Sequence, residues 1–148
     1  MKKKVDEVIK ICKMLNIVWL FFLVSFQTLQ ETDLWQTLMT VKYRYVNDVY
    51  IPTFNPQIQA FHNKEVVIKG YIYPLEEAPQ HSFFMLSYYP ASSCFFCGAA
   101  GPETVIEVNA IKPVKYSLKP IKLKGILKLN ADDPQRLFYI LNKAEQIP

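Results

Sequence analysis

The most regular hydrophobic pattern in the chain runs from Ile121 to Leu129 and alternates apolar with polar residues at a period of two. In an extended strand these residues lie on opposite faces: Ile121, Leu123, Leu127 and Leu129 on one, and Lys122, Lys124 and Lys128 on the other. Such alternation is typical of a strand whose sheet packs one face on a core and exposes the other to water. The pattern therefore predicts a strand over residues 121–129.

Four further runs are rich in β-branched and aromatic residues and are bounded by turn residues, which predicts four more strands. These runs are Val66–Tyr73, Ser82–Tyr89, Thr104–Val108 and Leu137–Leu141. Five such strands are enough for a small Greek-key barrel of the OB type. Gly70 and Gly125 each lie inside a predicted strand, where glycine permits the sharp coiling of a small barrel. We therefore predict a mainly all-β fold with a five-stranded OB-like barrel, and a β-sandwich is the alternative.

The region before the predicted barrel has a different pattern. Its apolar residues recur at helical spacing, which predicts one or two helical turns: Leu34, Trp35, Leu38 and Val41. Residues 47–59 contain Pro52 and Pro56 and are expected to form an extended loop. Residues 112–119 are expected to connect two strands of the barrel.

The N-terminal residues form a candidate targeting segment. A lead with five lysines precedes ten mostly apolar residues, 17–26, a run too short to span a bilayer as a helix. This layout is typical of a secretory signal peptide. We therefore expect a signal peptide over 1–26, a short helical or irregular docking segment over 27–62, and the barrel domain over 63–148. A buried N-terminal helix of a cytosolic protein and an uncleaved membrane anchor are the alternatives.

Removal of the leader changes the charge of the chain. The full sequence carries +4, but residues 1–26 hold five of its 17 basic and two of its 13 acidic side chains, which leaves 12 and 11. A nearly neutral domain lacks the basic surface that nucleic-acid binding requires. We expect an exported, periplasmic protein that binds no nucleic acid and is not an integral membrane protein after signal cleavage.

Both cysteines of the expected mature chain, Cys94 and Cys97, lie in one loop between two predicted strands. Exported proteins meet oxidising conditions, in which paired cysteines usually form a disulfide. A disulfide between Cys94 and Cys97 would add little to the stability of the folded state, because the loop that it closes is short. It would instead fix the turn and hold Phe95 and Phe96 in one orientation. Tyr88 and Tyr89 would flank the site and complete the loop surface.

Other chemistries remain open for the same pair of cysteines. Two thiolates at this spacing also suit a soft metal ion such as zinc or copper, and His81 and Glu103 are candidate additional ligands. A thiol–disulfide active site would place the first thiol at a helix N-terminus, but Gly98, Gly101 and Pro102 oppose a helix there. Free, inert thiols are the fourth possibility.

The remaining polar clusters have simple structural interpretations. Six lysines fall within 17 residues after the cysteine loop: Lys112, Lys115, Lys119, Lys122, Lys124 and Lys128. Lysines on the outer face of a strand prevent edge-to-edge aggregation, while a lipid- or glycan-binding barrel would use the same face or the barrel interior. Asp132 and Asp133 are expected in a solvated turn. The sequence holds no legible catalytic triad or phosphate-binding loop, so an enzyme is not excluded but a binding module is favoured.

A block of the sequence resembles a bacterial family of small exported proteins known as a domain of unknown function. The block runs from Phe84 through Cys94 and Cys97 to Pro102 and Val108, with an apolar strand, a cysteine loop and a Val-rich strand. The upstream Pro52-x-Phe54, Lys64-x-Val66-x-Ile68-x-Gly70-Tyr71 and Pro74-Leu75 fit the same family, as does the strand around Gly125.

This chain also departs from the family pattern, which is Cys-x-His followed by several prolines. Phe96 stands where the histidine would fall, Cys97 comes one residue later, and Pro102 alone represents the proline run. The resemblance implies a periplasmic OB-like barrel connected with transport or metal handling at the envelope. Its partner would be an envelope protein or a transporter component. We therefore expect a non-catalytic accessory module, with a thiol–disulfide redox protein as the alternative.

Overall fold

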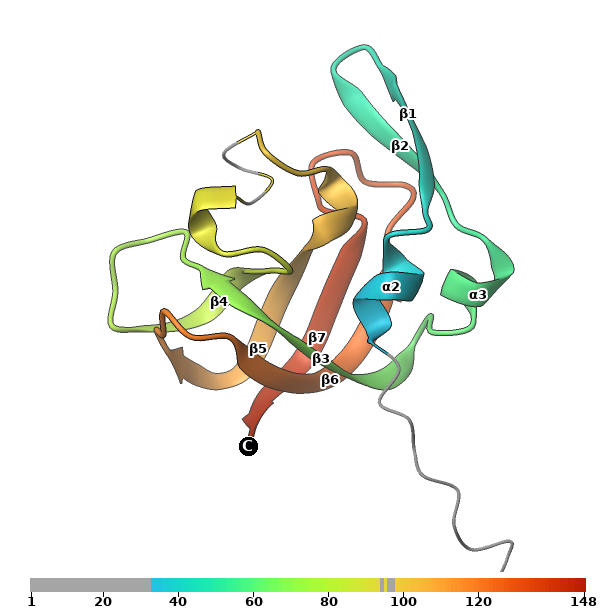
Figure 1. The fold of residues 1–148 in the computed structure, drawn as a ribbon. Helices are drawn as coiled ribbons and strands as arrows, with labels where there is room; N and C mark the ends of the chain where they lie inside the picture. Colours follow the sequence, from blue (N-terminus) through green and yellow to red (C-terminus); the bar gives the residue numbers. More distant parts are fainter. Residues whose placement is uncertain (1–32, 94, 96–97) are drawn as a thin grey trace, which may run out of the picture. The chain divides into compact units, whose positions relative to one another are not determined.

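The computed structural model describes residues 33–93, 95 and 98–148, and five of its strands close into a barrel (Figure 1). The strands are β3 (Lys64–Tyr73), β4 (Gln80–Ser87), β5 (Val105–Lys115), β6 (Ile121–Leu129) and β7 (Tyr139–Ile147). They are ordered β3-β4-β5-β7-β6, and β6 pairs with β3 to close the barrel. All pairs are antiparallel except β5 with β7, which is parallel. The predicted small all-β barrel is confirmed, and the β-sandwich alternative is wrong.

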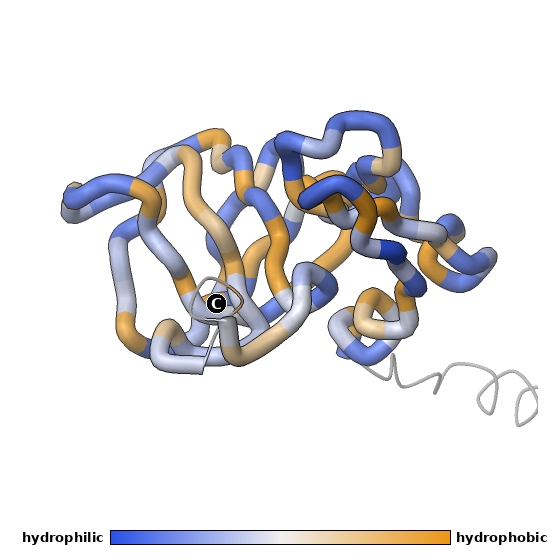
Figure 2. The backbone as a smooth tube through the Cα atoms, turned by 90° about the horizontal axis from the view of Figure 1, so that it is seen from above, coloured by the Kyte–Doolittle hydropathy of each residue, from blue (hydrophilic) through white to orange (hydrophobic). Residues whose placement is uncertain are grey.

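The two-residue alternation of β6 gives this strand one face buried in the barrel interior and one face toward solvent. Ile121, Leu123 and Leu127 are buried, whereas Lys122 and Lys124 are partly exposed and Lys128 is exposed. The other strands supply the remaining fully buried interior side chains, among them Phe84, Leu86, Ile106, Val108 and Leu141. Figure 2 shows the corresponding alternation of hydrophobic and hydrophilic residues along the barrel strands.

Both glycines inside strands lie where two backbones approach closely. β3 pairs with β6 up to Gly70 and with β4 from Tyr71 onward, so the strand changes partner at this residue. A Cβ at Gly70 would lie 2.7 Å from the carbonyl oxygen of Ser87. A Cβ at Gly125 would lie 2.9 Å from the carbonyl oxygen of Asn142, beside a register shift between β6 and β7. The coiling role predicted for these glycines agrees with this geometry.

The predicted helical turns are the short helix α2 (Leu34–Leu38), which packs on the barrel. The Asp33 side chain caps α2 by accepting a hydrogen bond from the Trp35 backbone N–H. The Trp35 side chain is 1% exposed, and its indole Nε1 donates to the carbonyl oxygen of Lys69 in β3 at 2.7 Å. The docking segment therefore contributes to the same core as the barrel.

The prediction of an extended loop over residues 47–59 is wrong, because this region forms a hairpin and a helix. Strand β1 (Lys42–Val46) pairs with β2 (Val49–Thr53) in a separate two-stranded sheet. Asn47 and Asp48 have φ values of 51° and 62°, which is the type I′ turn that matches strand twist. The short helix α3 (Pro56–Gln59) follows, with Asn55 as its cap.

Several predicted strand ends also differ from the structure. β5 continues to Lys115, so the first half of the expected connector 112–119 is strand. The extension is held by antiparallel pairing of Gln80 and His81 with Lys115 and Val114, beyond a β-bulge. β7 begins at Tyr139 and runs to Ile147, later than predicted. No helix in the described part of the chain is long and apolar enough to cross a membrane.

Candidate functional site

Three segments meet at one end of the barrel, which we call the loop end: the β1–β2 hairpin, residues 88–104 and residues 130–138 (Figure 1). Residues 88–104 include the cysteine loop and connect β4 to β5, whose ends pair at Ser87 and Val105. Residues 130–138 connect β6 to β7 at the same end, because β7 runs parallel to β5. Ring contacts join these segments to the hairpin.

The hairpin presents a group of tyrosines on one of its faces. The Tyr45 and Tyr50 rings lie directly across the hairpin with centroids 4.7 Å apart, and Tyr43 lies edge-on to Tyr50 at 5.6 Å. Tyr43 also contacts Phe138 at 5.6 Å, and Tyr50 contacts Phe95 at 6.3 Å. These contacts place Phe95, the residue after Cys94 in the sequence, against the hairpin. Tyr45 nevertheless remains 59% exposed.

A cleft of about 370 Å³ separates β2 from the β6–β7 connection. Its hairpin side consists of Val46, Asn47, Val49, Tyr50, Ile51 and Pro52. Its opposite side includes Asp132, Asp133, Pro134, Arg136 and Phe138. The cleft therefore combines apolar contact surface with two carboxylates at its rim.

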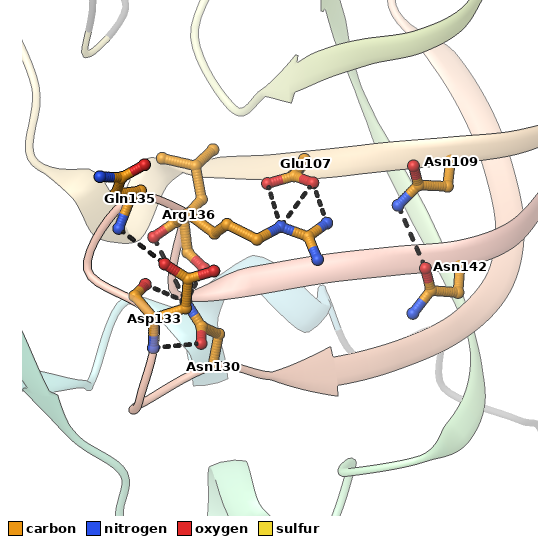
Figure 3. A network of polar contacts seen from close by, with 8 residues as sticks. Glu107, Asn109, Asn130, Asp133, Gln135, Arg136 and Asn142 are labelled. Atoms are coloured by element: carbon orange, nitrogen blue, oxygen red, sulfur yellow. Dashed lines mark hydrogen bonds and ion pairs between the residues drawn. The ribbon is translucent and has the colours of Figure 1, made fainter.

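The β6–β7 connection is shaped by the side chain of Asn130 (Figure 3). The Asn130 amide nitrogen donates to the carbonyl oxygens of Asp133 and Leu137 at 2.8 and 3.1 Å. The Asn130 amide oxygen accepts from the backbone N–H of Asp133 at 3.1 Å. Because Asn130 is almost fully buried, these bonds fix the loop that forms one wall of the cleft.

Arg136 is anchored to the barrel by an ion pair with Glu107 on β5 (Figure 3). Arg136 Nε donates to both carboxylate oxygens of Glu107, at 3.1 and 3.3 Å, and a terminal nitrogen donates as well. The Glu107 side chain is 5% exposed and that of Arg136 is 38% exposed. The positive charge of Arg136, which also lines the cleft, is thus matched by a buried carboxylate.

Glu103 lies in the short helical turn η3 (Pro102–Thr104), just after the cysteine loop. Its Oε2 atom is buried and has no hydrogen-bond partner in the described part of the chain. Burial and the nearby Glu103 carboxylate raise the pKa of Tyr43 above its ordinary value. The same two causes raise the pKa of Tyr139, whose hydroxyl donates to the carbonyl oxygen of Leu38. Glu103 is therefore the predicted ligand candidate that the structure places at the loop end.

His81, the other predicted additional ligand, lies elsewhere. His81 pairs with Val114 of β5. His81 lies six residues before Ser87, the end of β4 that leads into the loop, so about 20 Å of strand separates the two residues. The His81 side chain is 1% exposed, and neither ring nitrogen has a hydrogen-bond partner among the described residues. Its ring contacts Tyr116 at 6.4 Å. This placement argues against a site shared by His81 and the cysteine loop.

The predicted loop-surface residues divide between core and surface. Tyr88 packs against Trp35 at 5.8 Å and is partly buried, while Tyr89 meets Tyr88 edge-on at 4.8 Å and is 38% exposed. Phe95 contacts the hairpin, as described above. Phe96, Cys94 and Cys97 lie outside the described residues, as does the predicted leader.

The described residues bear on the alternative chemistries of the cysteine loop. Within them, no group of three or more His, Cys, Asp and Glu side chains could hold a metal ion. Residues 98–101, which follow Cys97, form a turn and bends before η3, and Gly98 has a φ of 74°. A helix N-terminus that would activate a thiol is therefore not formed by these four residues.

Sequence reasoning missed the hairpin, the Glu107–Arg136 pair and the role of Asn130. The Asn47-Asp48 dipeptide between two runs of aromatic and β-branched residues was the available signal for the hairpin. The charged pair joins residues 29 positions apart, so no local pattern links Glu107 to Arg136. The same holds for the buried amide of Asn130, which resembles any other turn asparagine in the sequence.

Comparisons with protein-family profiles and with curated proteins found no match. Among solved structures, the chain is similar to the crystal structure of a DUF3299 family protein from Pseudomonas aeruginosa PAO1. The sequences are 22% identical, the match covers 66% of this chain and 68% of that chain, and the TM-score is 0.47.

Proposed function

We propose that this chain is an exported, periplasmic and non-catalytic binding module that engages an envelope protein through the loop end of the barrel. The observation that carries the proposal is the contact between Tyr50 and Phe95, which joins the exposed tyrosines of the hairpin to the cysteine loop. Aromatic residues with a polar tip are enriched at protein interfaces, where they supply large contact area. The loop end gathers aromatic residues from three segments, and those of the hairpin are tyrosines.

In this proposal Cys94 and Cys97 form a disulfide with a positioning role. The bond would hold the cysteine loop, and Phe95 with it, in one orientation against Tyr50. The barrel interior is filled by fully buried side chains such as Phe84, Leu123 and Leu127, which favours a ligand surface outside the barrel.

The oxidation state of the pair is tested by the intact mass of the chain, purified from the periplasm without reductant. We expect a chain that begins after the leader, has a mass lower by two hydrogen atoms than the reduced form, and resists alkylation. Elemental analysis of the same sample should find no stoichiometric metal. The Cys94→Ser/Cys97→Ser variant serves as the control for alkylation. Free thiols, or retention of the leader in the cytosol, would contradict the proposal.

One observation favours a second candidate function, a soft-metal site at the loop end. The buried Oε2 atom of Glu103 has no described hydrogen-bond partner, and a carboxylate oxygen of this kind suits a third ligand beside two thiolates. In that case elemental analysis finds zinc or copper, the thiols become alkylated on denaturation, and Glu103→Gln lowers the metal content. Unchanged metal content in the Glu103→Gln variant would exclude Glu103 as a ligand.

The binding surface itself is tested by photo-crosslinking in cells that export the chain. A photoreactive phenylalanine derivative replaces Tyr45, which is 59% exposed at the loop end, or Leu118, which is 82% exposed between β5 and β6. We expect a discrete adduct with an envelope protein from position 45 and none from position 118. Equal adducts from both positions would show that the loop end is not the binding surface.

A further inference from the structure

The hairpin has a free strand edge that faces the cleft. The two-residue turn makes Val46 and Val49 a hydrogen-bonded pair, and the bonded and non-bonded pairs then alternate along β1 and β2. Tyr45 and Tyr50 therefore form a non-bonded pair, whose backbone N–H and C=O groups point away from the partner strand. No backbone bond from another described residue is recorded for Tyr50.

Pro52 supports this assignment of the edge. It pairs with Tyr43 at the next non-bonded position, where its backbone nitrogen points outward and no N–H is needed within the hairpin. The outward groups of β2 are thus the N–H of Tyr50 and the carbonyl oxygens of Tyr50 and Pro52. This row can accept one further strand, although Pro52 shortens it.

The cleft borders this edge of β2. Consecutive residues line it from Val49 to Pro52, and consecutive residues of a strand point to opposite faces. The lining from β2 therefore follows the edge of this strand and not one of its faces, and Val46 and Asn47 continue the lining around the turn. Phe138 and Pro134 form the apolar part of the opposite wall. The space is bounded on one side by free backbone groups and on the other by side chains.

The charges around the cleft select the kind of strand that fits. Asp132 and Asp133 line it and are exposed, whereas the guanidinium of Arg136 is engaged by Glu107. Arg136 also lines the cleft and interacts with Asp133. Because Arg136 is already paired with Glu107, the net charge around the cleft is still negative. A segment with basic side chains complements this rim, and apolar side chains in alternate positions complement Tyr50, Ile51 and Phe138.

We infer that the edge of β2 receives an extended segment of the partner protein, rich in lysine or arginine alternating with apolar residues, as a third strand of the hairpin. This mode of recognition is β-strand addition, in which backbone hydrogen bonds give affinity and alternate side chains give specificity. The inference rests on the proposed function and names the chemistry of the segment that the loop end binds.

The first test uses blocked, fluorescently labelled octapeptides and the purified chain. A peptide of alternating lysine and valine is expected to bind at least about tenfold more tightly than one of alternating glutamate and valine, because the acidic rim repels the second. The lysine–valine peptide with every backbone nitrogen methylated keeps its side chains and charge but cannot donate to Tyr50. We expect its binding to be lost.

The second test changes the edge while it preserves the hairpin. Tyr50→Pro removes the outward N–H without removing a bond between β1 and β2, and Tyr50→Val removes the ring but keeps the N–H. We expect Tyr50→Pro to weaken binding of the lysine–valine peptide about tenfold relative to Tyr50→Val. Tyr45→Pro blocks the opposite edge and also removes a ring that packs on Tyr50, so its control is Tyr45→Val, and these two variants should bind the peptide equally. Asp132→Asn should weaken binding of this peptide several-fold.

An equal loss of binding in Tyr50→Pro and Tyr45→Pro, each measured relative to the valine variant at the same position, would overturn the inference. Unchanged binding of the methylated peptide would also overturn it. These outcomes are separable from failure of the proposed function. If the cysteines form a disulfide and position 45 crosslinks to a partner, but the peptides bind without selectivity, the proposed function holds and the inference fails. The binding module would then recognise a folded surface of its partner. Peptide binding to a chain with free thiols would instead leave the strand-addition site without the proposed disulfide.

Discussion

At the scale of single residues, the contact between Arg136 and Glu107 joins an almost fully buried carboxylate to a half-exposed guanidinium. Removal of one partner from a buried ion pair destabilises a protein because it leaves the other charge desolvated and unmatched. Replacement of both partners by apolar residues avoids that penalty. The pair therefore holds the β6–β7 connection against β5, and its two members should behave differently when changed singly and together.

We predict that Arg136→Met lowers the free energy of unfolding by about 2 kcal/mol, less than for a fully buried pair because water reaches the guanidinium. The double variant Arg136→Met/Glu107→Leu should recover most of that loss. Urea unfolding followed by far-UV circular dichroism measures both. A double variant less stable than Arg136→Met alone would show that the carboxylate has a further stabilising partner.

His81 presents the opposite situation, a buried polar side chain whose ring nitrogens have no partner in the described part of the chain. A buried polar group without a hydrogen bond is destabilising relative to an apolar group of similar size. We predict that His81→Leu raises the free energy of unfolding by about 1 kcal/mol. The contrasting variant His81→Asn should lower it. Loss of stability in His81→Leu would mean that the ring is hydrogen-bonded, for example to a bound water.

At the scale of elements, the barrel depends on two strands that coil at glycines. Any side chain at Gly70 meets the backbone of Ser87, and any side chain at Gly125 meets the backbone of Asn142, so neither clash is relieved by a rotamer change. Gly98 differs, because a Cβ there meets nothing within 4 Å although its φ is 74°.

We predict that Gly70→Ala and Gly125→Ala each lower the free energy of unfolding by roughly 2–3 kcal/mol, the range for overpacked sites. Gly98→Ala, limited to the left-handed backbone penalty, should cost about 1 kcal/mol. The three variants can be ranked by their urea midpoints. Equal midpoints for all three would show that strand separation at Gly70 and Gly125 is easier than the close backbone contacts imply.

The elements that the sequence predicted are those with a strong local period. The alternation over Ile121–Leu129 and the helical spacing of Leu34, Trp35 and Leu38 each reflect one buried face, so pattern and structure coincide. The hairpin was not predicted, because both of its strands are largely exposed and the prolines in 47–59 indicated a loop. Strand ends such as Lys115 depend on pairing with a distant strand, which no local pattern contains.

The candidate site was predictable to a smaller extent than the fold. The sequence identified the cysteine loop and Glu103, which follows it, because residue type and spacing alone suggested their chemistry. It placed His81 beside them because the strand that His81 begins also leads to the loop. That strand is extended, however, so its two ends lie far apart. The cleft required knowledge of the hairpin, and the hairpin was not predicted.

At the scale of the whole described chain, residues 33–62 and the barrel share one core. The Trp35 indole donates a hydrogen bond to the backbone of β3. The Tyr139 hydroxyl of β7 donates one to the carbonyl oxygen of Leu38 in α2, at 2.8 Å. Leu34, Trp35, Leu38, Val41 and Ile58 belong to the same buried cluster as the barrel interior. Elements joined in one core unfold together, whereas elements that merely dock can be released first.

We predict that the docking segment and the barrel unfold in a single transition. Of the two tryptophans, Trp19 lies in the expected leader, so a chain without residues 1–26 reports on Trp35 alone by fluorescence. Its urea transition should coincide with that of the barrel strands, followed by circular dichroism. Tyr139→Phe removes one of the two hydrogen bonds that the Leu38 carbonyl oxygen accepts, the other coming from the Val41 N–H at 3.2 Å. The variant should move both transitions together to lower urea, by about 1 kcal/mol. A fluorescence transition that precedes the circular dichroism transition would instead make residues 33–62 a separable element. The hairpin of the loop end would then be able to detach while the barrel remains folded.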